Sequence, residues 1–168
     1  MRRTLLTLSM AMLAACATND DWAKGDGQQV ALVDAAGKPV GWVEFSPRAE
    51  GTYLRVAAEG LTPGDHGIHL HAVGRCEGPG FQSAGGHWNP EGRQHGHLNP
   101  QGQHQGDLPN ITVSANGRGT TAFLVSRHEM GDADGTSLVI HAQPDDYKTD
   151  PSGNSGDRVA CAVLTPAS

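Results

Sequence analysis

The sequence predicts an all-β domain, an eight-stranded antiparallel Greek-key sandwich or flattened barrel with two long functional loops. Short β-rich runs alternate with turn signals such as Asn116-Gly117 and Asp134-Gly135, and no stretch has helical periodicity. The 23 glycines suit many tight turns. Eight such runs, separated by turn signals typical of β-hairpins, favour a Greek-key arrangement. The predicted strands are 28–33, 39–45, 53–58, 67–73, 111–114, 120–125, 138–141 and 159–164.

Two long segments lack a strand pattern. Residues 74–110 are rich in glycine, histidine and asparagine, and residues 142–157 are polar and contain Asp145-Asp146. Loops of this length in a compact domain are usually either functional or disordered. Because both segments contain or border the residues with the most evident chemistry, we interpret both as functional loops.

The first 15 residues predict a secretory signal peptide. Arg2 and Arg3 precede an apolar run that is too short to span a bilayer and that ends in Ala14-Ala15-Cys16. This ending resembles a bacterial lipoprotein signal, in which the cysteine is acylated and becomes the new N-terminus. An ordinary signal peptide cleaved near Ala15 is the alternative.

The predicted organisation follows from the lipoprotein interpretation. Residues 1–15 are the signal peptide, 16–27 form a lipidated N-terminus on Cys16 with a flexible polar tether, and 28–168 form the folded domain. We expect the protein on the periplasmic side of a bacterial cell envelope, held to the membrane by its lipid. Ala17, which is not an aspartate, favours the outer membrane.

Charge and cysteine content narrow the class of protein. A net charge of −6 argues against nucleic-acid binding. If Cys16 carries a lipid, Cys76 and Cys161 are left to form a disulfide in an oxidising compartment. Two free buried thiols are the alternative.

The histidines are concentrated in one part of the chain, since all nine lie between His66 and His141. His69 and His71 stand two residues apart in a predicted strand, so their rings project from one face. Such a pair is half of a planar nitrogen set suited to Cu(II). A pair of solvent-facing strand histidines is the alternative.

The first long loop contains a second potential ligand set. His87, His95, His104 and Asp107 offer three imidazoles and one carboxylate, which is a complete four-coordinate set for a structural zinc ion. A polar loop with incidental histidines is the alternative.

Several motifs resemble those of the copper/zinc superoxide dismutase family, in order and over about residues 28–164. They are Gly67-Ile68-His69-Leu70-His71, the segments 83–90 and 104–110, Ile140-His141, the segment 153–161, and the spacing of His87, His95, His104 and Asp107. The resemblance implies dismutation of superoxide to dioxygen and hydrogen peroxide. A copper centre would cycle between Cu(II) and Cu(I), beside a structural zinc that shares a bridging histidine.

The resemblance also implies a role for each matching position, with one copper and one zinc per chain. Copper would be held by His69, His71, His87 and His141, and zinc by His87, His95, His104 and Asp107. Asp145 would join His69 to His95. Arg158 would draw in and orient the anion, His87 would supply a proton, and Cys76 and Cys161 would form the disulfide that holds the loop.

Two other functions are weighed against this one. A non-catalytic copper- and zinc-binding envelope protein predicts that a copper ligand or Arg158 is missing, and neither is. A plain adhesion-type sandwich would leave the ligand sets unexplained. A homodimer is compatible with the sequence, which does not locate its surface.

The remaining residues near these motifs receive smaller roles. Asp157 could pair with Arg158 and weaken its attraction for an anion. His66 is interpreted as structural, and His97 and His128 as surface residues. Phe81 and Trp88 are expected to pack the first loop down.

Overall fold

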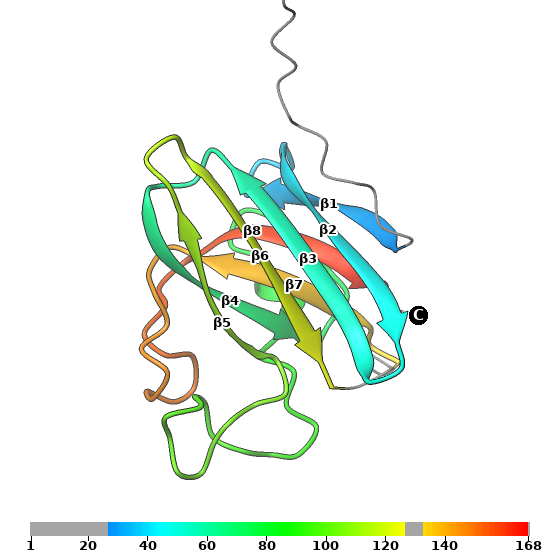
Figure 1. Ribbon diagram of the computed structural model, residues 1–168, viewed down its shortest axis with the longest axis vertical. Helices are drawn as coiled ribbons and strands as arrows, with labels where there is room; N and C mark the ends of the chain where they lie inside the picture. The colour runs from blue at the N-terminus through cyan, green and yellow to red at the C-terminus, as the bar shows by residue number, and fades with distance from the viewer. Residues whose placement is uncertain (1–26, 127–132, 168) are drawn as a thin grey trace, which may run out of the picture.

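The computed structural model describes residues 27–126 and 133–167, so the predicted signal peptide, Cys16 and His128 lie outside the described residues. Eight antiparallel strands close into a barrel in the spatial order β1-β2-β3-β6-β5-β4-β7-β8 (Figure 1). The connections from β3 to β4 and from β6 to β7 each pass over intervening strands, which confirms the Greek key. The strands are β1 (Gln28–Asp34), β2 (Pro39–Arg48), β3 (Gly51–Glu59), β4 (Gly64–His71), β5 (Asp107–Val113), β6 (Arg118–Val125), β7 (Thr136–His141) and β8 (Arg158–Thr165).

The barrel core is built by the alternation of apolar and polar residues along the strands. Leu54 and Val56 on β3 are 0% and 1% exposed, whereas Arg55 between them points outward. On the neighbouring strand β6, Phe123 is buried and Leu124 is exposed. Burying a large apolar side chain contributes about 1.5–3 kcal/mol, so this alternation fixes which face of each strand meets the core.

Pairing is brief at two seams of the barrel. β1 pairs with β8 only through Val33–Cys161 and Asp34–Ala160. β5 and β6 share the single pair Val113–Gly119, and a hollow of about 520 Å³ lies where these two strands diverge. The barrel is therefore closed by few ladder pairs at these two seams, whereas β2–β3, β3–β6 and β7–β8 pair over longer stretches.

The start of β5 differs from the sequence expectation. The strand begins at Asp107 rather than at residue 111, because Leu108 pairs with Ile68 on β4 and is buried. The register between β4 and β5 shifts between His66 and Ile68, which interrupts the alternation. Pro109 also obscures the start of β5 in the sequence, because proline has no N–H to donate to a strand ladder and is rare inside strands. The first long loop therefore spans residues 72–106.

The two long loops lie beside one another on one side of the barrel, green and orange in Figure 1. They are joined by a hydrogen bond from the Leu98 N–H to the Tyr147 carbonyl at 3.1 Å. The first loop contains a single-turn 3₁₀ helix, η1 (Gln82–Ala84). Within the part of the chain that the structure describes, no helix combines the length and the apolar character needed to cross a membrane.

Candidate metal centre

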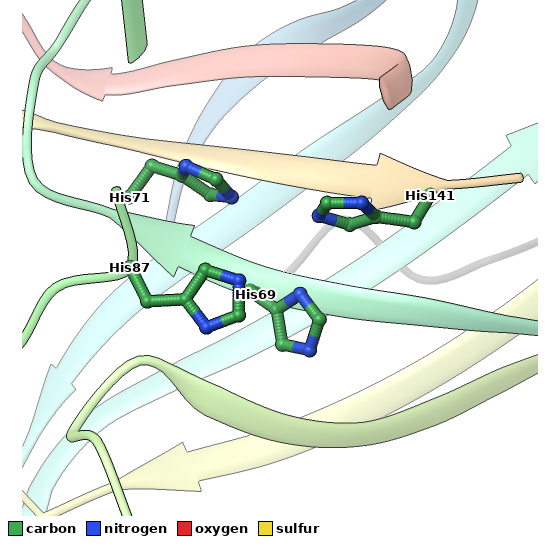
Figure 2. Close-up of side chains that lie close together, drawn as sticks. All are labelled: His69, His71, His87 and His141. Atoms are coloured by element: carbon green, nitrogen blue, oxygen red, sulfur yellow. The ribbon is translucent and has the colours of Figure 1, made fainter. Parts of the chain in front are cut away.

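Four imidazoles gather at the edge where β4 meets β7. His69 and His71 project from β4, His141 stands at the end of the adjacent strand β7, and His87 comes from the first long loop (Figure 2). An isolated antiparallel bridge between His71 and His87 brings that loop against β4. Residues far apart in the sequence are thus brought together by two neighbouring strands and one loop.

One nitrogen of each of these rings has no partner. Within residues 27–126 and 133–167, the buried side-chain nitrogens and oxygens that lack a hydrogen bond are His69 Nδ1, His71 Nε2, His87 Nε2 and His141 Nε2. Each of the four rings offers a ligand atom within 4.8 Å of those of the others. A buried polar atom without a partner is costly, and four converging ones fit the nitrogen set that Cu(II) prefers.

The second nitrogen of each ring is held by a hydrogen bond, which fixes its orientation. His71 Nδ1 donates to the Gly85 carbonyl at 3.0 Å, and His141 Nδ1 donates to the Gly156 carbonyl at 3.1 Å. The same bonds leave Nε2 of each ring as a lone-pair donor aimed into the cluster.

Burial keeps these rings neutral, which is the form that binds a metal. It lowers the pKa of His69 to about 3 and that of His141 to about 4. Burial also lowers the pKa of His71 well below its usual range, and it lowers the pKa of His87. The cluster is therefore ready to accept a cation at neutral pH.

A second cluster shares the His87 ring. Asp107 Oδ1 lies 2.9 Å from His87 Nδ1, 3.0 Å from His95 Nδ1 and 3.1 Å from His104 Nδ1. The Nδ1 atoms of His87 and His104 are 3.4 Å apart. Ligands at about 2.0–2.1 Å from a tetrahedral zinc ion lie roughly 3.3 Å from one another, so these four atoms fit a closed zinc site.

Asp145 joins the two clusters from the second loop. Its Oδ2 lies 2.9 Å from His69 Nε2 and its Oδ1 lies 3.0 Å from His95 Nε2, with all three side chains fully buried. Burial opposes ionisation of Asp145, but the hydrogen bonds from His69 and His95 outweigh it and hold the pKa of this carboxyl well below its usual range.

The acidic surroundings favour positive charge in the second cluster. Burial opposes protonation of His95, but its hydrogen bonds to Asp107 and Asp145 prevail and raise its pKa to about 9. Burial likewise disfavours the charge on Asp107, yet hydrogen bonds from His87 and His95 hold its pKa well below the usual range. A divalent cation would meet the same attraction as this proton.

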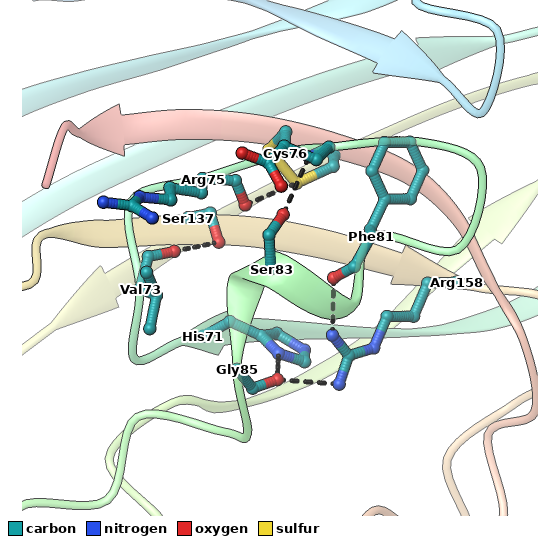
Figure 3. The surroundings of a disulfide bond; sticks show 11 residues. His71, Val73, Arg75, Cys76, Phe81, Ser83, Gly85, Ser137 and Arg158 are labelled. Atoms are coloured by element: carbon teal, nitrogen blue, oxygen red, sulfur yellow. Dashed lines mark hydrogen bonds between the residues drawn. A yellow bond between two sulfur atoms is a disulfide. The ribbon is translucent and has the colours of Figure 1, made fainter.

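Arg158, at the start of β8, lies next to the first cluster. Its Nη1 donates to the Phe81 carbonyl and its Nη2 to the Gly85 carbonyl, both at 2.7 Å (Figure 3). The Gly85 oxygen is the one that also accepts from His71. Through this shared carbonyl the guanidinium and a ring of the four-imidazole cluster are held in a fixed relation.

A disulfide ties the first loop to the last strand. Cys76 is bonded to Cys161 on β8, with a Cα–Cα distance of 5.7 Å and a sequence separation of 85. Such a long closed loop restricts the unfolded chain strongly in the chain-entropy description. In the folded chain, the bond anchors the segment whose carbonyls hold Arg158.

The remaining residues singled out by sequence also have defined places. His66 is buried, with Nδ1 2.6 Å from the His141 carbonyl and Nε2 2.8 Å from the Thr62 carbonyl, which is a structural role. His97 is exposed, and its ring lies against that of Tyr147 in a tilted arrangement with the centroids 4.4 Å apart.

Asp157 is exposed, and among the contacts of the described residues its carboxylate forms no ion pair with Arg158. Phe81 and Trp88 are 1% and 6% exposed and pack the first loop onto the barrel.

Three contributors to the site were not assigned by sequence reasoning. Asn110, on β5, brackets the main chain of Asp145 with two hydrogen bonds. Its place in a polar segment beside a ligand was the available signal. The carbonyls of Phe81 and Gly85 hold Arg158, and main-chain groups leave no signature in the residue types.

Comparison with known proteins agrees with this geometry. The sequence profile of copper/zinc superoxide dismutase (SODC) matches residues 40–164. The chain is 42% identical over 148 residues to a superoxide dismutase-like protein of Bacillus subtilis, covering 82% of this chain and 76% of that protein. It is 41% identical over 138 residues to a Cu-Zn superoxide dismutase of Caulobacter vibrioides, covering 76% and 79%.

A solved structure extends the comparison to the fold. The Cu/Zn superoxide dismutase from Brucella abortus superimposes with a TM-score of 0.67 at 33% identity, over 83% of this chain and 99% of that one. With its profile match and two ligand sets that share one imidazole, this chain belongs to the copper/zinc superoxide dismutase family.

Proposed function

We propose that this protein dismutates superoxide to dioxygen and hydrogen peroxide. The observation that carries the proposal is the His87 ring, which offers Nε2 to one ligand set and Nδ1 to the other. His69, His71, His87 and His141 would hold copper, and His87, His95, His104 and Asp107 would hold zinc. Bound copper supplies the Cu(II)/Cu(I) one-electron couple, and bound zinc supplies fixed positive charge.

The chain's own residues bring in the substrate and supply a proton. Arg158 attracts the anion and orients it beside the His71 ring, to which it is linked through the Gly85 carbonyl. The overall reaction consumes two superoxide anions and two protons and gives one dioxygen and one hydrogen peroxide, so it needs no outside oxidant or reductant. His87 would take up a proton from solvent at Nε2 in one half of the cycle and give it to the forming peroxide in the other half, and solvent would give the second proton.

The negative body of the protein makes the placement of Arg158 important. The net charge is −6, which repels an anion at long range. A local positive field in a cleft can still focus a small anion and raise its association rate. Arg158 is half-buried, so its charge is less screened by solvent than that of an exposed arginine.

Metal analysis combined with a superoxide-decay assay tests the function. The wild-type protein is expected to contain one copper and one zinc per chain and to accelerate decay. His141→Ala should retain zinc and lose both copper and activity, while the exposed His97→Ala should match wild type. A fully metal-loaded wild type without activity would instead favour the non-catalytic copper- and zinc-binding envelope protein.

We also propose that the protein is exported and lipid-anchored on the periplasmic side of the envelope. Residues 1–15 act as the signal peptide, Cys16 carries the lipid, and 16–27 form the tether; Ala17 favours the outer membrane. Mass spectrometry of the mature N-terminus should find an acylated Cys16, and Cys16→Ser should release the protein from the membrane fraction. An unmodified N-terminus at Cys16 or Ala17 would support an ordinary signal peptide.

The membrane and assembly state are separate expectations. Separation of inner and outer membranes by density tests the first. A homodimer is compatible with the sequence, and light scattering of the detergent-solubilised protein at several concentrations would distinguish it from a monomer.

A further inference from the structure

We propose that Phe81 is a positioning residue for Arg158. Its ring is wedged against the Cys76–Cys161 disulfide, and its main-chain carbonyl holds the guanidinium. The proposal rests on the proposed dismutase function for its consequence on rate, but the geometry it describes can be tested without catalysis.

The Phe81 ring fills the space between the loop and β7 and β8. It is 1% exposed and packs in a small apolar cluster with Ala84, Val139 and Cys161, with Cys76 against it. Figure 3 shows this ring beside the disulfide, with its carbonyl turned toward Arg158. This cluster is separate from the main barrel core, so it is the local support of the loop.

The backbone of Phe81 adopts a conformation that a phenylalanine rarely takes. Its φ of 52° and ψ of 29° lie in the left-handed region, where side chains with a Cβ are disfavoured. Such a conformation persists only where the surroundings impose it. The buried ring and the hydrogen bond from the Phe81 N–H to the Glu77 carbonyl at 3.1 Å supply that constraint.

This conformation decides where the carbonyl points. The Phe81 oxygen accepts from Arg158 Nη1 at 2.7 Å and from the Ala84 N–H at 3.1 Å. At the other end of η1, the Gly85 oxygen accepts from Arg158 Nη2 at 2.7 Å. The guanidinium is therefore gripped at both ends of a single helical turn, and its rotamer is fixed.

Loss of the ring would remove one of the two constraints on the left-handed backbone and leave only the main-chain hydrogen bond to Glu77. The Phe81 peptide could then rotate to a favoured conformation and turn its carbonyl away from Arg158. The guanidinium would keep only the Gly85 contact and gain freedom to swing toward solvent. A hollow of about 640 Å³ is lined in part by Arg158 and Gln82, so a small reagent can approach this arginine.

The rate at which Arg158 is chemically modified measures directly how firmly its guanidinium is held. We would treat wild type, Phe81→Leu and Phe81→Ala with phenylglyoxal and follow Arg158 by peptide mass spectrometry. Arg118, whose side chain is 63% exposed, serves as the internal reference. In the Phe81 variants, phenylglyoxal should modify Arg158 about tenfold faster than in wild type. This factor corresponds to the loss of roughly one charge-assisted hydrogen bond.

Phe123 provides the matched control, since it is also buried but belongs to the main core. Phe123→Leu and Phe123→Ala should lower the unfolding temperature and leave Arg158 reactivity at the wild-type value. In metal-loaded protein, kcat/KM at low ionic strength should fall about tenfold in the Phe81 variants, with copper, zinc and disulfide contents unchanged. It should stay near wild type in the Phe123 variants.

Two results would overturn the proposal. One is a rate of Arg158 modification in Phe81→Leu that lies within twofold of the wild-type rate. Because this variant keeps an apolar side chain, it tests the proposal even if Phe81→Ala does not fold. The other is an equal rise in the Phe123 variants. A wild-type protein that is loaded with both metals but inactive would refute the dismutase function only. The rates of Arg158 modification would still test whether Phe81 positions Arg158.

Discussion

Asn110 and Asp145 form a two-way pair between a side chain and a main chain. Asn110 Nδ2 donates to the Asp145 carbonyl at 3.0 Å, and the Asp145 N–H donates to Asn110 Oδ1 at 2.9 Å. The Tyr147 hydroxyl accepts from the Asn110 N–H at 2.9 Å. A strand of the barrel thus holds the loop whose carboxylate links the two ligand clusters.

Asn110→Asp should weaken zinc binding although it changes few atoms. A carboxylate can still accept from the Asp145 N–H, but it repels the carbonyl to which Nδ2 donated. Asp145 orients the zinc ligand His95, and loss of such a partner typically costs about 10–100-fold in metal affinity, so displacement of Asp145 should cost up to this much. Competition with a chelating dye measures this affinity. Gln29→Glu, which adds the same charge at an exposed position on β1, is the control, and an equal loss there would assign the effect to charge alone.

Gly153→Ala should disturb the Asp145 carboxylate. A Cβ at Gly153 would collide with Asp145 Oδ1 and lie 2.7 Å from His95 Nε2. Gly92 has the same φ of 63° but nothing within 4 Å of such a Cβ. Both variants bear the left-handed penalty of about 1–2 kcal/mol, whereas only Gly153→Ala should also lose zinc affinity. Thermal unfolding and chelator competition separate the two effects, and equal zinc affinity in both would contradict this account.

Asp157→Asn should raise kcat/KM at low ionic strength by about two- to threefold. Asp157 is exposed and next to Arg158 in sequence, so its charge opposes the attraction of an anion. The gain should shrink at high salt, because exposed charges are screened beyond a Debye length of about 3 Å at 1 M. Glu50→Gln removes an exposed charge elsewhere and should change the rate less. A large loss of activity in Asp157→Asn would mean that this carboxylate has another task.

The metal-free protein should be most stable near pH 6.5 as far as three buried histidines are concerned. The folded-state pKa values of His69 and His141 are lowered to about 3 and about 4. The unfolded chain therefore binds more protons below pH 6.5, and stability falls as the pH falls through this window. The pKa of His95 is raised to about 9, so its contribution is complete below pH 6.5 and is lost as the pH rises to 9.

Thermal unfolding of chelator-treated protein between pH 4 and 9 measures this dependence. Protein loaded with copper and zinc should have a flatter profile over the neutral range, because metal ions compete with the protons. An unfolding temperature that rises on acidification from pH 6.5 to 5 would show that these histidines do not control the metal-free fold.

The sequence was informative where side chains follow a simple periodicity. The alternation in Tyr53–Ala58 and its neighbours identified strands, and the two-residue spacing of His69 and His71 placed both rings on one face. Prediction was poorer where the backbone departs from this rule. The register shift near Gly67 and the proline at 109 concealed the start of β5.

The two hydrogen bonds that hold the Arg158 guanidinium could not be predicted, because their acceptors are main-chain carbonyl oxygens, which every residue carries. Only the unusual φ of Phe81, a tertiary property, aims one of them at the guanidinium. The link between Asn110 and Asp145 likewise depends on a strand meeting a distant loop, a contact between residues 35 positions apart.

The short pairing between β5 and β6 has a consequence for where the barrel opens transiently. With one ladder pair, Val113–Gly119, and a hollow beside Leu108 and Phe123, fewer hydrogen bonds resist separation here than between β2 and β3. At the other brief seam, Val33 of β1 also packs against the apolar cluster that contains Phe81 and Cys161. We expect transient opening to begin at β5–β6, where amide hydrogens should exchange with deuterated solvent sooner than those of β2 and β3.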